Sequence, residues 1–147
     1  MKSDGLRNVL LTLWVGGLWV TGYMVAPLLF SSLPDRMLAG MLAGKMFAAI
    51  SWVGFVCGIY LLIDSANRSG TSALKEGFFW AVLLMLVLTA AGHFGIQPVI
   101  EHLKEEAMPR DVMQSVFQDR FRTWHGISSV VYLVESVLGL YLVVAKR

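Results

Sequence analysis

Residues 36–63 read RMLAGMLAGKMFAAISWVGFVCGIYLLI and form the strongest structural signal in the chain. About 20 mostly apolar residues make a helix long enough to cross the ~30 Å hydrocarbon core of a bilayer. Three further stretches meet this requirement, at about residues 8–30, 77–98 and 123–145. The sequence therefore predicts an all-α fold, an integral membrane four-helix bundle that forms one domain over residues 1–147.

The composition agrees with lipid as the solvent. Of the 147 residues, 56% are hydrophobic and 15% are charged, whereas soluble domains carry about 25% charged residues. The formal net charge is only +2, and the basic residues lie at segment ends and form no patch, which argues against nucleic acid as a partner. The single cysteine, Cys57, rules out an intrachain disulfide. We expect the lipid bilayer to be the main partner.

The three connections between these helices differ in character. Residues 31–35 predict a tight turn in which Ser32 caps the second helix. Residues 64–77 are rich in Ser, Gly, Asn and Thr and predict a flexible polar loop. Residues 99–122 mix charges with apolar residues at helical spacing, with a break at Met108-Pro109. Helices 3 and 4 should therefore extend beyond the membrane as a helical hairpin, with a kink at Pro98.

The orientation follows from the distribution of Lys and Arg. Six lie on the side of the termini and five on the side of the hairpin: Lys2, Arg7, Arg68, Lys75, Lys146 and Arg147, against Arg36, Lys104, Arg110, Arg120 and Arg122. This difference predicts an inner-membrane protein of a bacterium with its termini in the cytoplasm.

The second helix carries glycines four residues apart at Gly40/Gly44 and again at Gly54/Gly58. Such small residues let helix backbones approach closely in lipid. One interpretation is packing within the chain against the first helix, where Gly22 and Ala26 repeat the spacing. The other is contact with a second copy, as a homo-oligomer, or with a larger membrane complex.

Four ionisable residues fall at membrane depth: Lys45, His93, His125 and Glu135. Each costs roughly 2.5–3.5 kcal/mol at a helix centre, so each is a candidate functional residue. Together with Gln97 they predict a polar seam, an ion or small-molecule path. Lys45 and Glu135 lie at similar depth and would form an ion pair or a proton site; alternatively Lys45 extends outward and Glu135 bonds to Tyr132 or Ser51.

His93 and His125 lie at equal height in a hairpin folded about Met108-Pro109. Two facing imidazoles could ligate a haem iron or share a metal ion with a carboxylate. The alternative is that they hydrogen-bond across the hairpin to Gln97, Ser128, Ser129 or water. The chain offers no phosphate loop, no paired CxxC and no Ser/His/Asp set, so we expect no catalytic residues and no cofactor, with haem or a metal ion as the alternative.

Three motifs carry a resemblance to a known family. They are WVGGLW with VAPLLF in the first helix, AGMLAGKMF in the second, and residues 117–129 leading into the fourth. They resemble the domain of unknown function 4149 family, the transmembrane-protein-205-like membrane proteins, over almost the whole chain. The chain is also distantly similar to the copper-resistance membrane domain, and to four-helix protoporphyrinogen oxidases, whose first-helix histidine it lacks.

The resemblance implies handling of a metal or small molecule. Taken with the seam, we expect non-enzymatic handling of an ion or small molecule, or an accessory role in a membrane complex. The alternative is a haem- or metal-binding redox protein that uses His93 and His125.

Overall fold

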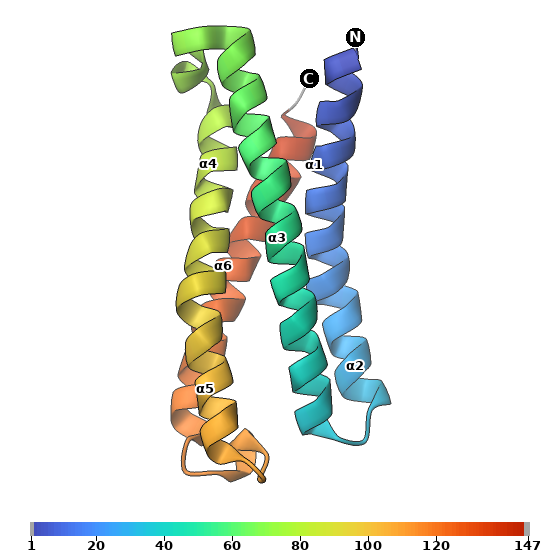
Figure 1. The fold of residues 1–147 in the computed structure, drawn as a ribbon, viewed down its shortest axis with the longest axis vertical. Helices are drawn as coiled ribbons and strands as arrows, with labels where there is room; N and C mark the ends of the chain where they lie inside the picture. Colours follow the sequence, from blue (N-terminus) through green and yellow to red (C-terminus); the bar gives the residue numbers. More distant parts are fainter. Residues whose placement is uncertain (1, 146–147) are drawn as a thin grey trace.

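The computed structural model is a bundle of long helices (Figure 1), and it describes residues 2–145, with side chains from Asp4 onward. Consecutive elements join end to end into four rods. The elements are α1 (Lys2–Val20), the π turn η1 (Thr21–Val25), α2 (Ala26–Ser32), α3 (Arg36–Ser69), the 3-10 turn η2 (Gly70–Lys75), α4 (Gly77–Ala90), the π turn η3 (Ala91–Ile96), α5 (Gln97–Ala107), the 3-10 turn η4 (Val112–Gln114) and α6 (Gln118–Val144).

All four rods are long and apolar enough to cross a membrane. They span Asp4–Ser32, Arg36–Lys75, Gly77–Ala107 and Gln118–Val144, and an 18-residue window within each has a mean hydropathy of 1.7 to 2.2. Large apolar side chains such as Val56, Phe94 and Val130 are more than half exposed, which suits a surface covered by lipid and not by water. The predicted all-α membrane bundle is confirmed, and the chain is a multi-pass membrane protein.

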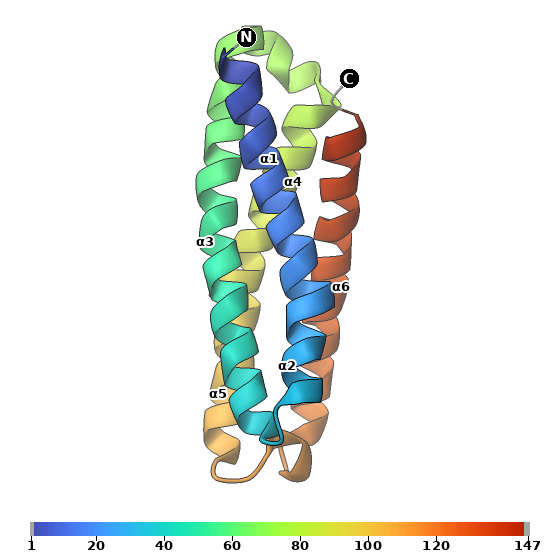
Figure 2. The same ribbon diagram turned by 90° about the vertical axis from the view of Figure 1, so that its right-hand side faces the viewer.

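The two ends of the bundle carry different connections. Both chain termini lie at one end together with η2, here called the terminal end (Figures 1 and 2). The α2–α3 turn and the α5–α6 connection lie at the other, here called the loop end. Around the terminal half, α3 packs against α1 and α4, and α6 packs against the same two helices. The rods therefore form a closed ring there.

The apolar core lies in this closed half. It is built around Trp14, Leu61, Met85 and Leu142, each at most 2% exposed. Trp14 packs on α3 where α3 has no side chain: a methyl group on Gly54 would lie 2.5 Å from Trp14 Nε1. Within lipid, close packing of this kind replaces the hydrophobic drive that holds soluble bundles together.

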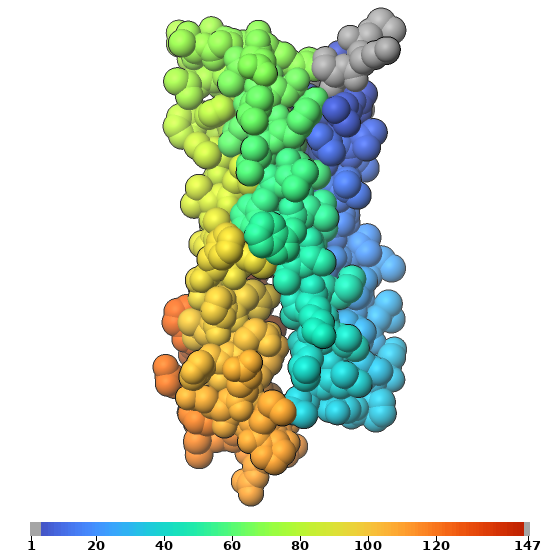
Figure 3. All heavy atoms as spheres, in the orientation of Figure 1, coloured from blue at the N-terminus to red at the C-terminus, as the bar shows by residue number. Residues whose placement is uncertain are grey.

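The loop half is open. There α2 packs against α3, and α5 packs against α6, but α3 does not pack closely along α5, nor α2 along α6. The bundle thus divides into two arms, α2/α3 and α5/α6. The space-filling view shows the resulting slit between the orange α5 region and the blue-green start of α3 (Figure 3).

Two proline residues account for the breaks within the rods. Pro27 and Pro98 each lie two residues after a π turn, η1 and η3 respectively. A proline inside a helix has no N–H to donate and crowds the carbonyl four residues before it. The wider π turn relieves this crowding. The sequence predicts a kink at Pro98, and the structure has the π turn Ala91–Ile96 directly ahead of it.

Two local predictions are wrong. Ser32 ends α2 and caps nothing; Asp35 is the N-cap of α3, and its Oδ1 accepts from the backbone N–H of Met37 (2.9 Å) and of Leu38 (3.2 Å). Residues 64–75 are helical and not a polar loop. Their polar residues pair with one another and with α1: Arg68 bridges Asp64 (2.9 Å) and Asp4 (2.5 Å).

The residues of the predicted hairpin, 99–122, are helical on both sides of one connection. Helix α5 continues to Ala107 and α6 begins at Gln118, and residues 108–117 between them contain one 3-10 turn. Val116, placed by its spacing on the apolar face of a helix, lies in this connection and is 93% exposed.

We predict that Gly54→Ala destabilises the bundle by about 1–3 kcal/mol, the usual cost of overpacking. The added methyl group would push Trp14 and α1 away from α3. Gly16→Ala is the matched control, because nothing lies within 4 Å of a methyl group there, and alanine favours the helix equally at both sites. Thermal unfolding in mild detergent measures the difference. Equal unfolding temperatures for the two variants would contradict this packing.

Candidate functional site

Three neighbouring spaces lie between the middle of the bundle and the loop end. The inner cavity, of about 50 Å³, lies between Trp14 and Ser128 and receives side chains from all four rods. The cleft, of about 510 Å³, separates the two arms. The side groove, of about 340 Å³, runs between α3 and α5 on the outside of the bundle. Gln97 is a lining residue of all three.

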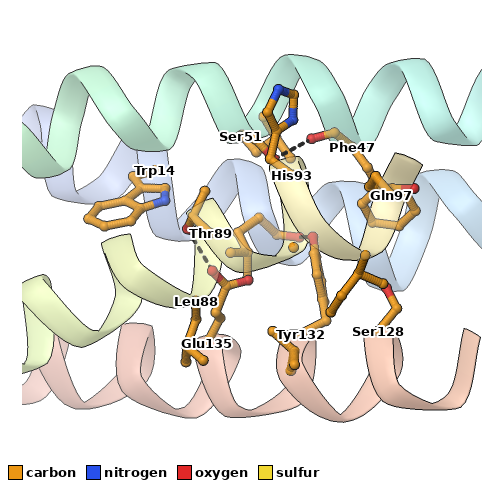
Figure 4. Close-up of a pocket in the computed structure, with 15 residues that line it drawn as sticks. Trp14, Phe47, Ser51, Leu88, Thr89, His93, Gln97, Ser128, Tyr132 and Glu135 are labelled. Carbon is orange, nitrogen blue, oxygen red and sulfur yellow. Dashed lines mark hydrogen bonds between the residues drawn. The ribbon is translucent and has the colours of Figure 1, made fainter. Parts of the chain in front are cut away.

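Glu135 is the buried acid of the inner cavity, with only 5% of its surface exposed. Its Oε1 lies 2.6 Å from the hydroxyl oxygen of Thr89 on α4 (Figure 4). That hydroxyl is also 2.8 Å from the carbonyl oxygen of Met85. Sequence reasoning missed Thr89 as the partner. The available signal was its position four residues before His93, which places it on the same face of the helix.

A chain of hydrogen bonds beside Glu135 ties α6 to the first rod. The Tyr132 hydroxyl donates to the carbonyl oxygen of Leu18. The Tyr23 hydroxyl donates to Ser136 Oγ (2.8 Å), which donates to the Tyr132 carbonyl oxygen (2.8 Å). These bonds fix the Tyr132 ring, which lines both the inner cavity and the cleft.

His93 belongs to the π turn η3 and points toward α3 (Figure 4). Its ring packs edge-on against Trp52 at 5.4 Å and Phe55 at 5.9 Å between ring centroids. Its Nδ1 is buried without a hydrogen-bond partner among the described residues. The side chain lines both the inner cavity and the side groove.

His125 lies elsewhere, on the wall of the cleft, stacked on Phe121 at 5.6 Å with an angle of 10° between the rings. The structure does not bring His93 and His125 to one cavity. Among residues 4–145, no three His, Cys, Asp or Glu side chains cluster as a metal site would require. Ligation of haem or a metal ion by these histidines stays a prediction, for which a visible absorption spectrum and metal analysis are the tests.

Lys45 and Glu135 are likewise separate. Lys45 is exposed and lines the side groove with His93, Gln97 and Glu101. No ion pair joins it to Glu135 in the described part of the chain, where the Glu135 carboxyl meets Thr89. An exposed lysine on a membrane helix can extend its stem toward the interface. The five residues of the predicted seam are thus distributed over three spaces that share Gln97.

The glycines of α3 serve two purposes. Gly54 and Gly58 receive Trp14, so this part of the small-residue face packs within the chain. Gly40 and Gly44 line the cleft, and a methyl group added at Gly40 would have nothing closer than 3.8 Å. The absence of a side chain at Gly40 therefore leaves space between the arms, whereas at Gly44 an added methyl group would lie 2.8 Å from Glu101 Oε1.

The cleft wall is mostly apolar, with polar groups in few places. Phe30, Phe47, Ile100 and Leu133 supply apolar surface. Toward the loop end, Lys104 Nζ donates to Glu101 Oε1 (3.0 Å) and to the Gly40 carbonyl oxygen (3.2 Å), so it links the two arms. Toward the middle of the bundle lie the remaining polar side chains, Tyr23, Gln97, His125, Ser128, Ser129 and Tyr132.

Comparison with known proteins identifies the family. A family model described as "Domain of unknown function (DUF4149)" matches residues 9–109, more than half of the chain. The match contains Lys45, His93 and Gln97 and ends before α6, so it does not cover the motif at residues 117–129 or Glu135. No curated protein and no solved structure was found to match the chain. The chain belongs to the DUF4149 family of domains of unknown function.

Proposed function

We propose that this membrane protein binds an amphipathic small molecule within the bilayer and that the cleft is its binding site. The observation that carries this proposal is the cleft itself: about 510 Å³ of space between two helical arms. Small-molecule sites typically measure about 300–1,000 Å³ and combine an apolar wall with a few polar groups. Handling of a small molecule requires no catalytic residue, in keeping with the non-enzymatic role expected from the sequence.

The distribution of polar groups supports an amphipathic ligand. An apolar body would pack against Phe47, Ile100 and Leu133, and a polar group would meet Lys104 at the loop end. The charge of Lys104 is balanced by its bond to Glu101, which lines the side groove and not the cleft. A ligand with a polar but weakly charged head therefore fits this cleft better than a free ion.

The side groove supports entry from the membrane. It lies between α3 and α5, where the arms stay apart, and it shares Gly44 and Gln97 with the cleft. A molecule dissolved in the bilayer could reach the cleft through this opening without crossing the closed half. Gly54 and Gly58 pack within the chain and are not free for contact with another protein. Association with a second copy or with a larger membrane complex stays a prediction.

We predict that Gly40→Phe empties the cleft of its ligand. The phenyl ring would occupy the space that Gly40 leaves between the arms. Native mass spectrometry of protein purified in mild detergent measures the bound fraction: the wild type should carry a small-molecule adduct, and Gly40→Phe should lose most of it. Gly126→Phe on the outer face of α6 is the control and should keep the adduct, because nothing lies within 4 Å of a methyl group at this exposed position. A wild type without adduct, or equal occupancy in all three proteins, would overturn the proposal.

We also propose that the protein lies in the bacterial inner membrane with both termini in the cytoplasm. Three of the six basic residues that the sequence assigns to the cytoplasmic side, Arg7, Arg68 and Lys75, lie at the terminal end. The side chain of Lys2 and the whole of Lys146 and Arg147 lie outside the described residues.

Cysteine labelling tests this orientation. In a Cys57→Ala background, a cysteine at the exposed position Gln114 of the loop end should react with a membrane-impermeant maleimide in intact cells. A cysteine at exposed Thr71 of the terminal end should react only after the cells are permeabilised. The reverse pattern would show that the termini face outward.

A further inference from the structure

The Thr89 hydroxyl has one hydrogen and two acceptors. Its oxygen lies 2.8 Å from the Met85 carbonyl oxygen and 2.6 Å from Glu135 Oε1. Both distances are those of O–H···O hydrogen bonds, but a hydroxyl can donate only once. If Thr89 donates to Met85, the hydrogen between Thr89 and Glu135 must come from Glu135. Both hydrogen bonds can therefore form at the same time when Glu135 is protonated.

The same positions of Thr89, Met85 and Glu135 also suit an ionised Glu135 carboxylate. When Glu135 loses its proton, rotation of the Thr89 hydroxyl hydrogen from Met85 toward Oε1 gives the carboxylate a donor, and no backbone has to move. The Met85 carbonyl then loses only its additional bond to the hydroxyl. Thr89 can thus serve both protonation states of Glu135, as a hydroxyl beside a proton-exchanging carboxyl must.

No cation among the described residues of the inner cavity offsets a charge on Glu135. The other titratable groups around it are Tyr132 on its own helix, Tyr23 from η1 and His93 from η3. The elements α1 and α3 contribute Trp14, Leu18, Phe47, Ile50 and Ser51 to the inner cavity, and none of these is charged. A buried carboxyl without a fixed counter-ion is a typical proton-relay group in membrane proteins.

Access to Glu135 comes from the cleft. The inner cavity of about 50 Å³ exceeds the roughly 10–15 Å³ that one water molecule requires by the same kind of measure. Polar groups of Gln97, Ser128 and Tyr132 line both the inner cavity and the cleft. Trp14 and the apolar core around Met85 lie on the opposite, terminal side. The polar residues between Glu135 and the cleft therefore lie on the side of Glu135 that faces the loop end.

We propose that Glu135 is a proton-binding site that loads and unloads through the inner cavity and the cleft, with the Thr89 hydroxyl as its hydrogen-bonding partner in both states. The proton passes from a cavity water that carries it to Glu135 Oε1 and returns to water by the same route. This site does not depend on which molecule occupies the cleft.

Infrared difference spectroscopy across a pH titration tests the site on the full chain in lipid nanodiscs. The wild type should show the C=O band of a buried protonated carboxyl, and this band should disappear on deprotonation. Glu135→Gln should abolish the band. Thr89→Val keeps the shape of the side chain but lacks the hydroxyl, and it should shift the frequency of the band, so the assignment rests on two variants. Glu105→Gln, at an exposed position of α5, should leave the band unchanged.

The route is tested by the rate at which this band shifts after transfer to heavy water. Ser128 lines both spaces, whereas its neighbour Ser129 lines only the cleft among the three spaces. Ser128→Leu should slow the exchange several-fold, and Ser129→Leu should leave it near the wild-type rate. A titratable band that persists in Glu135→Gln, a carboxyl band that never titrates, or equal exchange in both serine variants would overturn the proposal.

Discussion

The contact between Trp14 and the glycine face of α3 is the packing on which the rest of the structure depends. Lipid offers helices no hydrophobic drive to associate, so close approach of backbones has to supply the attraction. Gly54 and Gly58 leave a hollow that the indole fills, with Leu86 also in contact with Gly58. This contact holds α1, α3 and α4 together at the terminal half. Because that half is closed, the other half can stay open without loss of the bundle.

The open half has its own physical cause. Pro27 and Pro98 interrupt two of the rods at corresponding places, and each is preceded by a π turn. Beyond these turns α2 packs against α3, and α5 packs against α6. The rods therefore continue as two pairs and no longer as a ring. Gly40 and Gly44 then present bare backbone to the space between the pairs. Proline and glycine, usually destabilising inside helices, here create room.

The polar groups of the candidate site lie where the closed and open halves meet. Glu135 and Thr89 lie on the closed side of this boundary, and the cleft lies on the open side. Tyr132 contributes to both and is fixed by its bond to Leu18. A molecule in the cleft and a proton on Glu135 would therefore share a wall. This proximity offers a physical means of linking ligand occupancy to protonation, since both act on the same side chains.

Much of the fold could be predicted from the sequence because helix length and hydropathy are local properties. The four apolar stretches, their all-α class and the break near Pro109 follow from residues close together in the chain. The same reasoning selected His93, Gln97 and Glu135, since polar residues at membrane depth are rare enough to be conspicuous. It went wrong at residues 64–75, where a polar composition indicated a loop. Their helix is stabilised by the Arg68 contacts to Asp4 and Asp64, and one of these partners is 64 residues away.

Which helix faces meet depended on the tertiary structure, because contacts between distant residues leave no periodic trace in a single sequence. A shared height could suggest that His93 and His125 face each other, but the rotation of each helix directs one toward α3 and the other into the cleft. The same rotation gives Glu135 a threonine and not a lysine as its partner. The cleft is likewise invisible in the sequence, since an unfilled volume arises from the divergence of whole helices and belongs to no single segment.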